Sequence, residues 1–413
     1  MKWKAPVLFL CLAAAALVLL ACLPFGKEGA PVSYVPMEPV TIMVATDPHF
    51  LAPSLTDGGE AFLSVVTHAD GKYMQRIGEI IDALFDRAAV ERPAALILSG
   101  DLTFNGERGS HEAFAAKCAA LEETGVPVLV LPGNHDLNRP DAVRFAGNQT
   151  VPVENINAAD FRRIYAAFGY DEALSEDTHS LSYVYRLCEG LRLLFVDCNA
   201  DAGSDTIPEE TFAWIEAQLQ AAQNAGERVV AVSHQTVLQH NARFVDGFAV
   251  TNRARLLRLY REYHVALNLS GHMHIQHIRQ ESGLTELVTG ALSVQPCSYG
   301  VLTLTERGGD YAARSAVSAG LQSEATAFFR GNAFHQGMAA GDEDMAKYLA
   351  DLNTAYFSGR MDLAERNDGL QYRLKSTLIC REKFPFHVFL LSRLRQVHRR
   401  PSRLHRLPYY PPI

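Results

Sequence analysis

The sequence predicts an α/β fold in which two β-sheets pack against each other between layers of helices. From Val40 to about Ala312, apolar runs that fit buried strands alternate with amphipathic segments that fit helices. Two strand-like segments, 182–187 and 191–197, follow each other without a helix between them. This mixture favours a two-sheet α/β sandwich over a purely doubly wound parallel sheet.

The periodicity of apolar residues gives the positions of individual elements. The two strands at 182–187 and 191–197 are expected to form a hairpin that turns at Glu189-Gly190. This turn would pair Cys188 near Leu191 rather than opposite Cys198. We expect helices at Tyr73–Ala89, His111–Thr124, Asp160–Phe168 and Pro208–Ala225.

Beyond residue 312 the pattern becomes helical, so we expect a first domain at 40–312 and a helical C-terminal domain with a basic tail at 313–413. Packing against the first domain is the expected role of this region, in preference to a groove for a cofactor or partner. Two apolar stripes at helical spacing carry this expectation: Val317, Leu321, Ala325 and Phe328, and Met345, Tyr348, Leu349, Leu352 and Tyr356.

Five short polar segments each follow an apolar run that reads as a buried strand. In chain order they are Asp47-Pro48-His49, Gly100-Asp101, Gly133-Asn134-His135-Asp136, His234 and Gly271-His272-Met273-His274. Strand ends that bring Asp, Asn and His together on one rim are what a two-metal hydrolase needs.

The residue types fit metal ligation. Asp47 and His49 stand two apart, so in extended chain both side chains point to one face and can hold one ion. The two histidines of the last segment repeat that spacing. Asp101 can offer one oxygen to each of two ions, and Asn134 supplies a neutral oxygen. This mixed set suits manganese, iron, zinc or nickel rather than calcium.

Each segment taken singly has a structural alternative. Gly133-Asn134 is ordinary turn chemistry, and His234 alone fits a hydrogen-bonded core histidine. The order of all five segments, each directly after a strand, favours the metal site over these alternatives.

The order D-x-H, G-D, G-N-H-[DE], H, G-H-x-H resembles that of the calcineurin-like metallophosphoesterases, and it spans residues 47–274. The run at 100–111 and the C-terminal helical region resemble bacterial class III cyclic-nucleotide phosphodiesterases.

The resemblance implies two metal sites that share one carboxylate. One ion would be held by Asp47, His49, Asp101 and His274, and the other by Asp101, Asn134, His234 and His272. The resemblance also implies that His135 lies near the leaving-group oxygen and that Asp136 orients it.

The implied activity is hydrolysis of phosphodiesters, with cyclic nucleotides as the leading substrate class. A hydroxide that bridges two divalent ions (Mn, Fe or Zn) would attack phosphorus. Two alternatives remain open: a phosphomonoesterase or nucleotidase on the same metal core, and a non-catalytic surface protein that kept the fold as a binding module.

Three further residues are candidates for substrate contact, namely Thr103, Asn105 and His240. Thr103 and Asn105 follow the metal-binding Asp101, but they also fit caps of the helix that begins near Gly109. His240 fits a surface histidine equally well. The connection from His49 to Asp70 shows little regular pattern, so we expect a long loop on the substrate rim.

The N-terminus predicts a bacterial lipoprotein. Lys2 and Lys4 precede an apolar run, and the following Leu-Leu-Ala-Cys fits a lipobox that ends at Cys22. Residues 1–21 would be a signal peptide, Cys22 would carry lipid, and proline-rich 22–39 would be a tether. An uncleaved signal anchor is the alternative, and both place the protein on the extracytoplasmic face of the cell membrane.

Charge and cysteine content limit the partners. The net charge of −8 gives no reason to expect a nucleic-acid polymer. Six arginines between Ser392 and Arg406 could bind anionic lipid or wall polymer, or form an atypical terminus. The five cysteines that remain besides Cys22 (118, 188, 198, 297 and 380) are expected to be mostly buried and unbridged. The sequence does not determine the oligomeric state.

Overall fold

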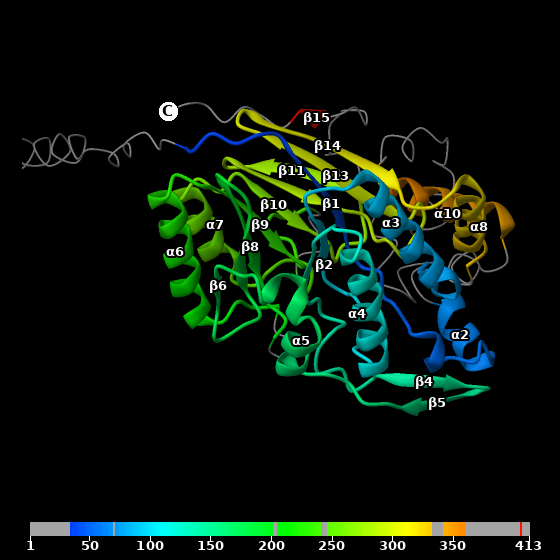
Figure 1. The fold of residues 1–413 in the computed structure, drawn as a ribbon. Coiled ribbons are helices and arrows are strands. Elements are labelled where there is room, and N and C mark those ends of the chain that lie inside the picture. Colours follow the sequence, from blue (N-terminus) through cyan, green and yellow to red (C-terminus); the bar gives the residue numbers. More distant parts are fainter. Residues whose placement is uncertain are drawn as a thin grey trace, which may run out of the picture. The chain divides into compact units, whose positions relative to one another are not determined.

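Two mixed β-sheets form the centre of the structure, a computed structural model (Figure 1). It describes residues 34–68, 71–200, 205–240, 246–332, 342–359 and 405–406. The first sheet has the order β15-β14-β13-β1-β2-β3 and the second has the order β11-β12-β10-β9-β8-β7-β6. The predicted α/β class with two sheets is therefore confirmed.

The strands of the first sheet are β1 (Val40–Ala45), β2 (Leu96–Ser99), β3 (Val128–Leu131), β13 (Ser298–Thr305), β14 (Gly308–Ser315) and β15 (His405–Arg406). The strands of the second sheet are β6 (Ser175–Glu176), β7 (Tyr183–Cys188), β8 (Leu191–Val196), β9 (Arg228–Ser233), β10 (Leu267–Ser270), β11 (His277–Glu281) and β12 (Leu284–Val288). Within these sheets β1, β2 and β3 run parallel, as do β8, β9, β10 and β12.

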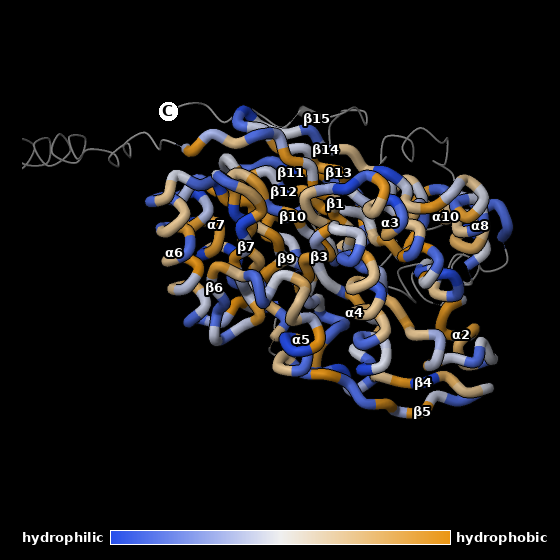
Figure 2. The backbone as a smooth tube through the Cα atoms, viewed as in Figure 1, coloured by the Kyte–Doolittle hydropathy of each residue, from blue (hydrophilic) through white to orange (hydrophobic). Residues whose placement is uncertain are grey.

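Alternation of side chains along β8 shows how the sheets are layered. Leu193 and Phe195 join the core that the two sheets share. Leu194 and Val196 point to the opposite face, into a second core beneath helices. Figure 2 shows the corresponding apolar colouring along the inner strands.

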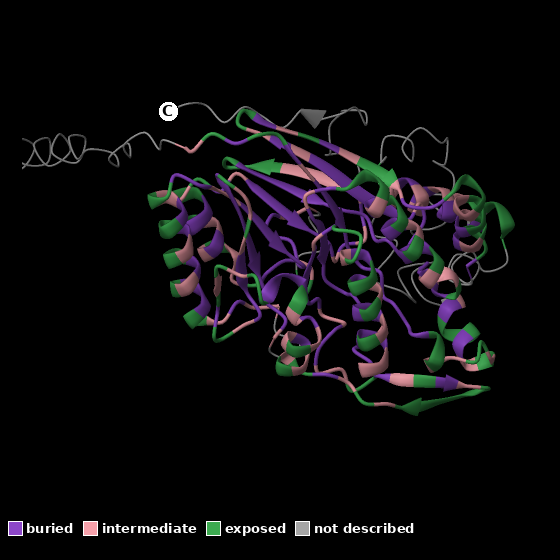
Figure 3. Ribbon diagram, in the orientation of Figure 1, coloured by how far each residue is buried: buried purple, intermediate pink, exposed green. Residues whose placement is uncertain are grey.

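Helices cover the outer faces of both sheets. Helices α6 (Glu209–Asn224) and α7 (Arg253–Glu262) pack on the second sheet, and α3 (Ile77–Glu91) and α4 (Arg108–Glu122) pack on the first. Figure 3 shows buried strands between helices whose outer surfaces are exposed. The central strands are therefore packed on both faces, which fixes where their ends lie.

All four predicted helices exist, with shifted ends. A short 3₁₀ turn at Met74–Arg76 precedes α3, and α6 matches its prediction to within one residue at each end. Helix α5 (Ala158–Ile164) stops earlier than predicted, in a π-turn at Ala166–Tyr170. Gly169 has φ +101° inside that turn, a conformation that ends a right-handed helix.

The prediction of a long loop between His49 and Asp70 is partly wrong, because this connection contains α2 (Glu60–His68). This helix buries Phe62 but exposes Leu63 and Val65, so its apolar residues do not form the single stripe that sequence analysis looks for. It packs on an unpredicted hairpin of β4 (Val143–Ala146) and β5 (Gln149–Pro152).

The β7–β8 hairpin is confirmed, including its register. Cys188 pairs with Leu191, as the turn at Glu189-Gly190 predicted. Within the described part of the chain no cysteine is bridged, and Cys118, Cys198 and Cys297 are buried. Cys380 lies outside the described residues.

The C-terminal helices α8 (Ala319–Gly331) and α10 (Glu343–Phe357) pack against the sheet domain, as their apolar stripes predicted. Val317 and Ala325 join the main core, and Tyr356 contacts the apolar cluster of Met273 and Ile275. The predicted boundary at residue 312 falls inside β14. Within the described ranges no helix has the length and apolarity to span a bilayer. The predicted signal, Cys22 and basic tail lie outside those ranges, apart from β15.

Glu107, the residue before α4, is a buried acid of this fold. Its Oε2 accepts a hydrogen bond from the Asn105 N–H at 3.2 Å. Its Oε1 is buried and has no hydrogen-bond partner among the described residues. Burial raises the pKa of Glu107 to about 7 from 4.5. The folded protein therefore keeps this proton at a pH where the unfolded chain has lost it.

We predict that Glu107 makes stability fall as pH rises. Its contribution is complete below pH 4.5 and is lost between pH 4.5 and about 7, a change of up to about 3 kcal/mol. Glu107→Gln removes the buried charge, so its stability relative to the native protein should increase between pH 4.5 and 7.5. Urea unfolding at both pH values measures this. Exposed Glu123→Gln is the control, and an equal change in both variants would contradict the prediction.

Candidate metal centre

The five polar segments lie at the carboxyl ends of five strands. The first three follow β1, β2 and β3 of the first sheet, and the last two follow β9 and β10 of the second. Backbone hydrogen bonds continue past the strands, from Asp47 N–H to Gly100 O at 3.1 Å and from His49 N–H to Asp101 O at 2.9 Å. The parallel strands of the two packed sheets thus end at the same edge of the fold, and the loops that carry the predicted ligands lie there.

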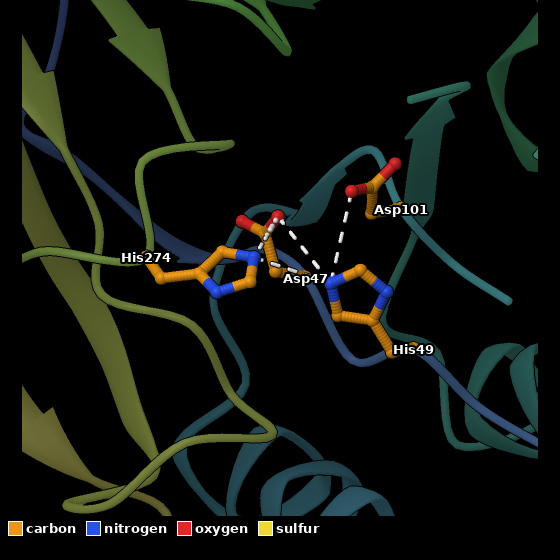
Figure 4. Close-up of side chains that lie close together, drawn as sticks. All are labelled: Asp47, His49, Asp101 and His274. Atoms are coloured by element: carbon orange, nitrogen blue, oxygen red, sulfur yellow. Dashed lines mark hydrogen bonds and ion pairs between the residues drawn. The ribbon is translucent and has the colours of Figure 1, made fainter. Parts of the chain in front are cut away.

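Figure 4 shows the first group, Asp47, His49, Asp101 and His274, with its side chains pointing toward one another. Their ligand atoms all lie within 4.8 Å of one another. Nε2 of His49 lies 3.2 Å from Nε2 of His274 and 3.7 Å from Oδ2 of Asp101. Nε2 of His274 lies 3.2 Å from Oδ1 of Asp47. This is a compact set of two nitrogens and two carboxylates.

The second group shares Asp101 with the first and adds His234 and His272. Oδ1 of Asp101 lies 3.3 Å from Nε2 of His234, whereas Oδ2 faces His49. Asn134 completes this side, because its Oδ1 lies 3.2 Å from the same nitrogen of His234. The structure therefore brings all seven predicted metal residues together, with Asp101 between the two groups.

Backbone carbonyls orient the histidines of the second group. His234 donates from Nδ1 to Ser99 O at 2.8 Å, which leaves Nε2 for a ligand. His272 donates from Nε2 to Gly247 O at 2.7 Å, which leaves Nδ1. Such partners fix the ring orientation and the tautomer of metal-binding histidines.

The negative charges of this site, and an oxygen that accepts no hydrogen bond, fit the binding of two cations. Asp47 Oδ1 is buried and accepts no hydrogen bond among the described residues, while Oδ2 accepts from Thr46 Oγ1 and His272 N–H. Burial alone would raise the pKa of Asp101, but His234 and its other histidine neighbours hold it well below the ordinary value. Burial alone would lower the pKa of His234, but Asp101 raises it to about 10. A buried carboxylate that stabilises a neighbouring positive charge this strongly suits divalent cations.

Most of the predicted ligands have an unusual backbone conformation. A positive φ is uncommon outside glycine and costs on the order of 1–3 kcal/mol where the structure enforces it. It occurs here at Asp47 (52°), His49 (46°), Asp101 (50°), His272 (64°) and His274 (57°). Strain concentrated at one cluster of polar residues is a property of functional sites.

Three glycines of the segments are required by close approach, and a Cβ on the first, Gly100, would lie 2.4 Å from Nδ1 of His234. A Cβ on Gly133 would lie 2.3 Å from both N and Oδ1 of Asp101 and 2.8 Å from Nε2 of His234. A Cβ on Gly271 would lie 2.8 Å from Oδ2 of Asp47 and closer still to Thr46 Oγ1. None of the three positions leaves room for a side chain.

His135 lies beside the first group, with its ring 4.8 Å from that of His49. Its Nδ1 lies 2.8 Å from Phe104 O and 2.9 Å from Asn105 Oδ1, so these two acceptors orient the ring. The sequence had indicated that Asp136 orients His135, but the structure gives this role to Phe104 and Asn105. Asn105 is therefore a positioning residue as well as a candidate for substrate contact.

Asp136 instead holds two loops together. Its carboxylate accepts hydrogen bonds from the N–H groups of Leu102, Thr103 and Gly133 and from Thr103 Oγ1. Thr103 is itself fully buried and also accepts from Gly106 N–H. The hydroxyl of Thr103 is thus used inside this loop network, and the contact of Thr103 with substrate stays a prediction.

His240 is likewise corrected. Its side chain is fully buried, with Nε2 3.1 Å from Glu286 Oε2 and Nδ1 2.8 Å from His277 Nδ1. Glu286 also accepts from the N–H groups of Val237 and Leu238. This buried acid, which the sequence analysis missed, supports the loop that follows His234.

A buried set of Asp, Asn and His at strand ends, able to hold two ions, defines the class of two-metal hydrolases. The family model for calcineurin-like phosphoesterases matches residues 40–276, so the chain belongs to that family. The predicted family is confirmed. No curated protein sequence matches the chain.

The solved structures to which this chain is similar are distant in sequence. A dimetal phosphatase from Danio rerio is 16% identical, with 70% of this chain and 98% of that chain covered and a TM-score of 0.48. A purple acid phosphatase from yellow lupin is 13% identical, with coverage of 69% and 53% and a TM-score of 0.41. A putative 5′-nucleotidase from Staphylococcus aureus is 11% identical, with coverage of 65% and 51% and a TM-score of 0.38.

We predict that Gly133→Ala weakens metal binding by about 10–100-fold, because the new methyl group would displace the Asp101 carboxylate and the His234 ring. Metal content after dialysis and calorimetric titration with Mn²⁺ measure the effect. Gly78→Ala in α3 is the control, since its Cβ meets nothing within 4 Å. Unchanged metal affinity in the folded Gly133→Ala protein would show that Asp101 does not need this close approach.

Proposed function

We propose that this protein hydrolyses phosphoesters with two bound divalent ions, of manganese, iron or zinc, and that phosphodiesters, cyclic nucleotides among them, are its main substrates. The observation that carries the proposal is the shared carboxylate: Asp101 presents one oxygen to His49 and the other to His234. Two adjacent ions supply Lewis acidity to phosphoryl oxygens and activate water at neutral pH.

His135 is the residue that would handle the leaving group. Its Nδ1 is engaged by Phe104 O and Asn105, which leaves Nε2 for a substrate. Burial is the main reason that the pKa of His135 is lowered, and the attraction of Asp101 does not offset it. The neutral ring can accept at Nε2 the proton that the attacking water releases and deliver it to the departing oxygen, a transfer worth about 10²–10⁴ in rate.

The preference for diesters, including cyclic nucleotides, rests on the resemblance of the motif order and of residues 100–111 to class III phosphodiesterases. A phosphomonoesterase or nucleotidase is the second candidate. The observation in its favour is the positive charge of Lys72 and Arg139, both close enough to His135 to lower its pKa. A phosphomonoester carries more negative charge than a diester, and such charges would bind it.

A non-catalytic binding module would be expected to have lost metal ligands or His135. The chain retains all seven predicted ligands and His135. This complete set supports an enzyme.

We predict that the manganese-loaded full chain hydrolyses bis-p-nitrophenyl phosphate and cyclic AMP faster than p-nitrophenyl phosphate. His135→Ala should lower kcat by about 10²–10⁴ and keep its metal, because His135 is not among the ligands. Metal analysis and initial rates on the three substrates measure both effects. Faster hydrolysis of the monoester would move the assignment to a phosphomonoesterase, and no turnover of any phosphoester would contradict the proposal.

We also propose that the enzyme acts at the extracytoplasmic face of the membrane, attached through lipidated Cys22. The support is the apolar run and lipobox of the sequence.

Expression in a bacterium with labelled palmitate should give a labelled protein, and Cys22→Ser should abolish the label, because that thiol would carry the lipid. Cys188→Ser is the control that keeps all label. Membrane-bound but unlabelled native protein would favour the uncleaved anchor instead.

A further inference from the structure

Two buried amide side chains pair with each other at the residue that follows His234. This residue, Gln235, is fully buried, and Asn199 beside it is also buried. Gln235 Nε2 donates to Asn199 Oδ1 at 2.6 Å, and Asn199 Nδ2 donates to Gln235 Oε1 at 3.0 Å. The two side chains thus form a reciprocal pair of hydrogen bonds, which we call the amide pair.

Neighbouring groups determine how each amide of the pair is turned. Asn199 Nδ2 has a second acceptor in Pro132 O at 3.2 Å, and Gln235 Nε2 has a second acceptor in Asp205 Oδ1 at 2.9 Å. Gln235 Oε1 also accepts from Cys198 Sγ at 2.9 Å. Each NH₂ group therefore uses both of its donors. Turning either amide around would place its oxygen against an acceptor oxygen, so the arrangement is unique.

The amide pair connects the two sheets beside the second group of predicted ligands. Pro132 directly follows β3 of the first sheet and precedes Asn134 by two residues. Asn199 follows β8, which neighbours β9 in the second sheet. Gln235 follows His234, after the end of β9. The pair is therefore a bridge of side chains from the loop that carries Asn134 to the loop that carries His234.

This bridge lies where two predicted ligands from different sheets must meet. Oδ1 of Asn134 lies 3.2 Å from Nε2 of His234, although one residue follows β3 and the other follows β9. Asp47, His49 and His274, which belong to the first group, follow β1 and β10 instead. Loss of the bridge should therefore disturb the second group more than the first.

We propose that Gln235 and Asn199 are positioning residues for the second metal ion, and that they hold the loops of Asn134 and His234 at the spacing which that ion requires. The inference rests on the proposed two-metal function and extends it to residues outside the predicted ligand set. Hydrogen-bonded partners behind metal ligands fix the orientation of the ligands, and their loss reduces metal affinity. A buried amide pair suits this role because an unpaired buried amide is costly.

The test replaces the amide of Gln235 in the full chain and measures the binding of each ion. Gln235→Met keeps the length of the side chain but removes its donors and its acceptor. Calorimetric titration of the metal-free protein with Mn²⁺ should show one binding step as in the native protein and the other weakened by about 10–100-fold. Gln220→Met is the control, since this exposed residue of α6 bonds to Gln223 and Asn224 of the same helix.

Electron paramagnetic resonance gives a second readout that a loss of stability alone would not change. At a Mn²⁺ concentration that fills both sites of the native protein, the signal of a spin-coupled pair of ions should change in folded Gln235→Met to that of an isolated ion. Gln235→Glu should have the same effect. It keeps the shape of the side chain but places an oxygen against Asp205 or Asn199. Thermal unfolding verifies that each variant folds.

A double-mutant cycle tests whether the two amides act together. Asn199→Leu should weaken the same binding step as Gln235→Met. The double variant should lose little more than the larger single loss, because each change removes the same bridge. Fully additive losses would contradict a joint role.

Unchanged binding of both ions by folded Gln235→Met and Gln235→Glu would overturn the inference. Equal weakening of both steps would also overturn it, because the effect would then be a general loosening of the site. If the native protein binds two ions and Gln235→Met loses one of them, but no phosphoester is hydrolysed, the positioning role stands and the proposed activity fails. A native protein that binds a single ion would overturn both.

Discussion

The carboxylate of Asp101 joins the two halves of this structure. It lies at the end of β2 in the first sheet, yet its Oδ1 is 3.3 Å from His234, which follows β9 of the second sheet. The same oxygen accepts the N–H of His135 at 2.8 Å. Gly133 must lack a side chain so that this approach is possible. The packing of one sheet on the other therefore determines the geometry of the site, and small shifts between the sheets would separate the ligand groups.

A second buried carboxylate maintains that position. Asp136 collects N–H groups from both sides, Leu102 and Thr103 after Asp101, and Gly133 before Asn134. Burial, with the nearby charge of Asp101, raises its pKa to about 7. Its hydrogen bonds oppose that cost, because each N–H stabilises the charged form. Asp136, which was predicted to orient His135, thus holds together the loops that carry the predicted metal ligands.

The features of this fold that depend on local pattern could be predicted from the sequence. Buried strands followed by polar segments gave the sheets and the positions of the ligands, since both features repeat over a few residues. Features that depend on contacts between residues far apart in the chain could not be predicted in this way. His240 looked like a rim residue because nothing nearby in sequence indicates Glu286, 46 residues later. Helix α2 was missed because its exposed apolar residues hide its amphipathic pattern.

The packing partners of the C-terminal helices are a further example of distant contacts that the sequence does not reveal. Their apolar stripes predicted packing, but a stripe does not identify the surface it covers. Helix α8 packs on Gly71 and Tyr73, while Phe357 at the end of α10 accepts from Gln276 N–H, two residues after His274. Both contacts lie beside segments that enter the metal centre. Helix α10 therefore supports the loop that carries the last two predicted ligands, and a chain that ended at β14 would lack that support.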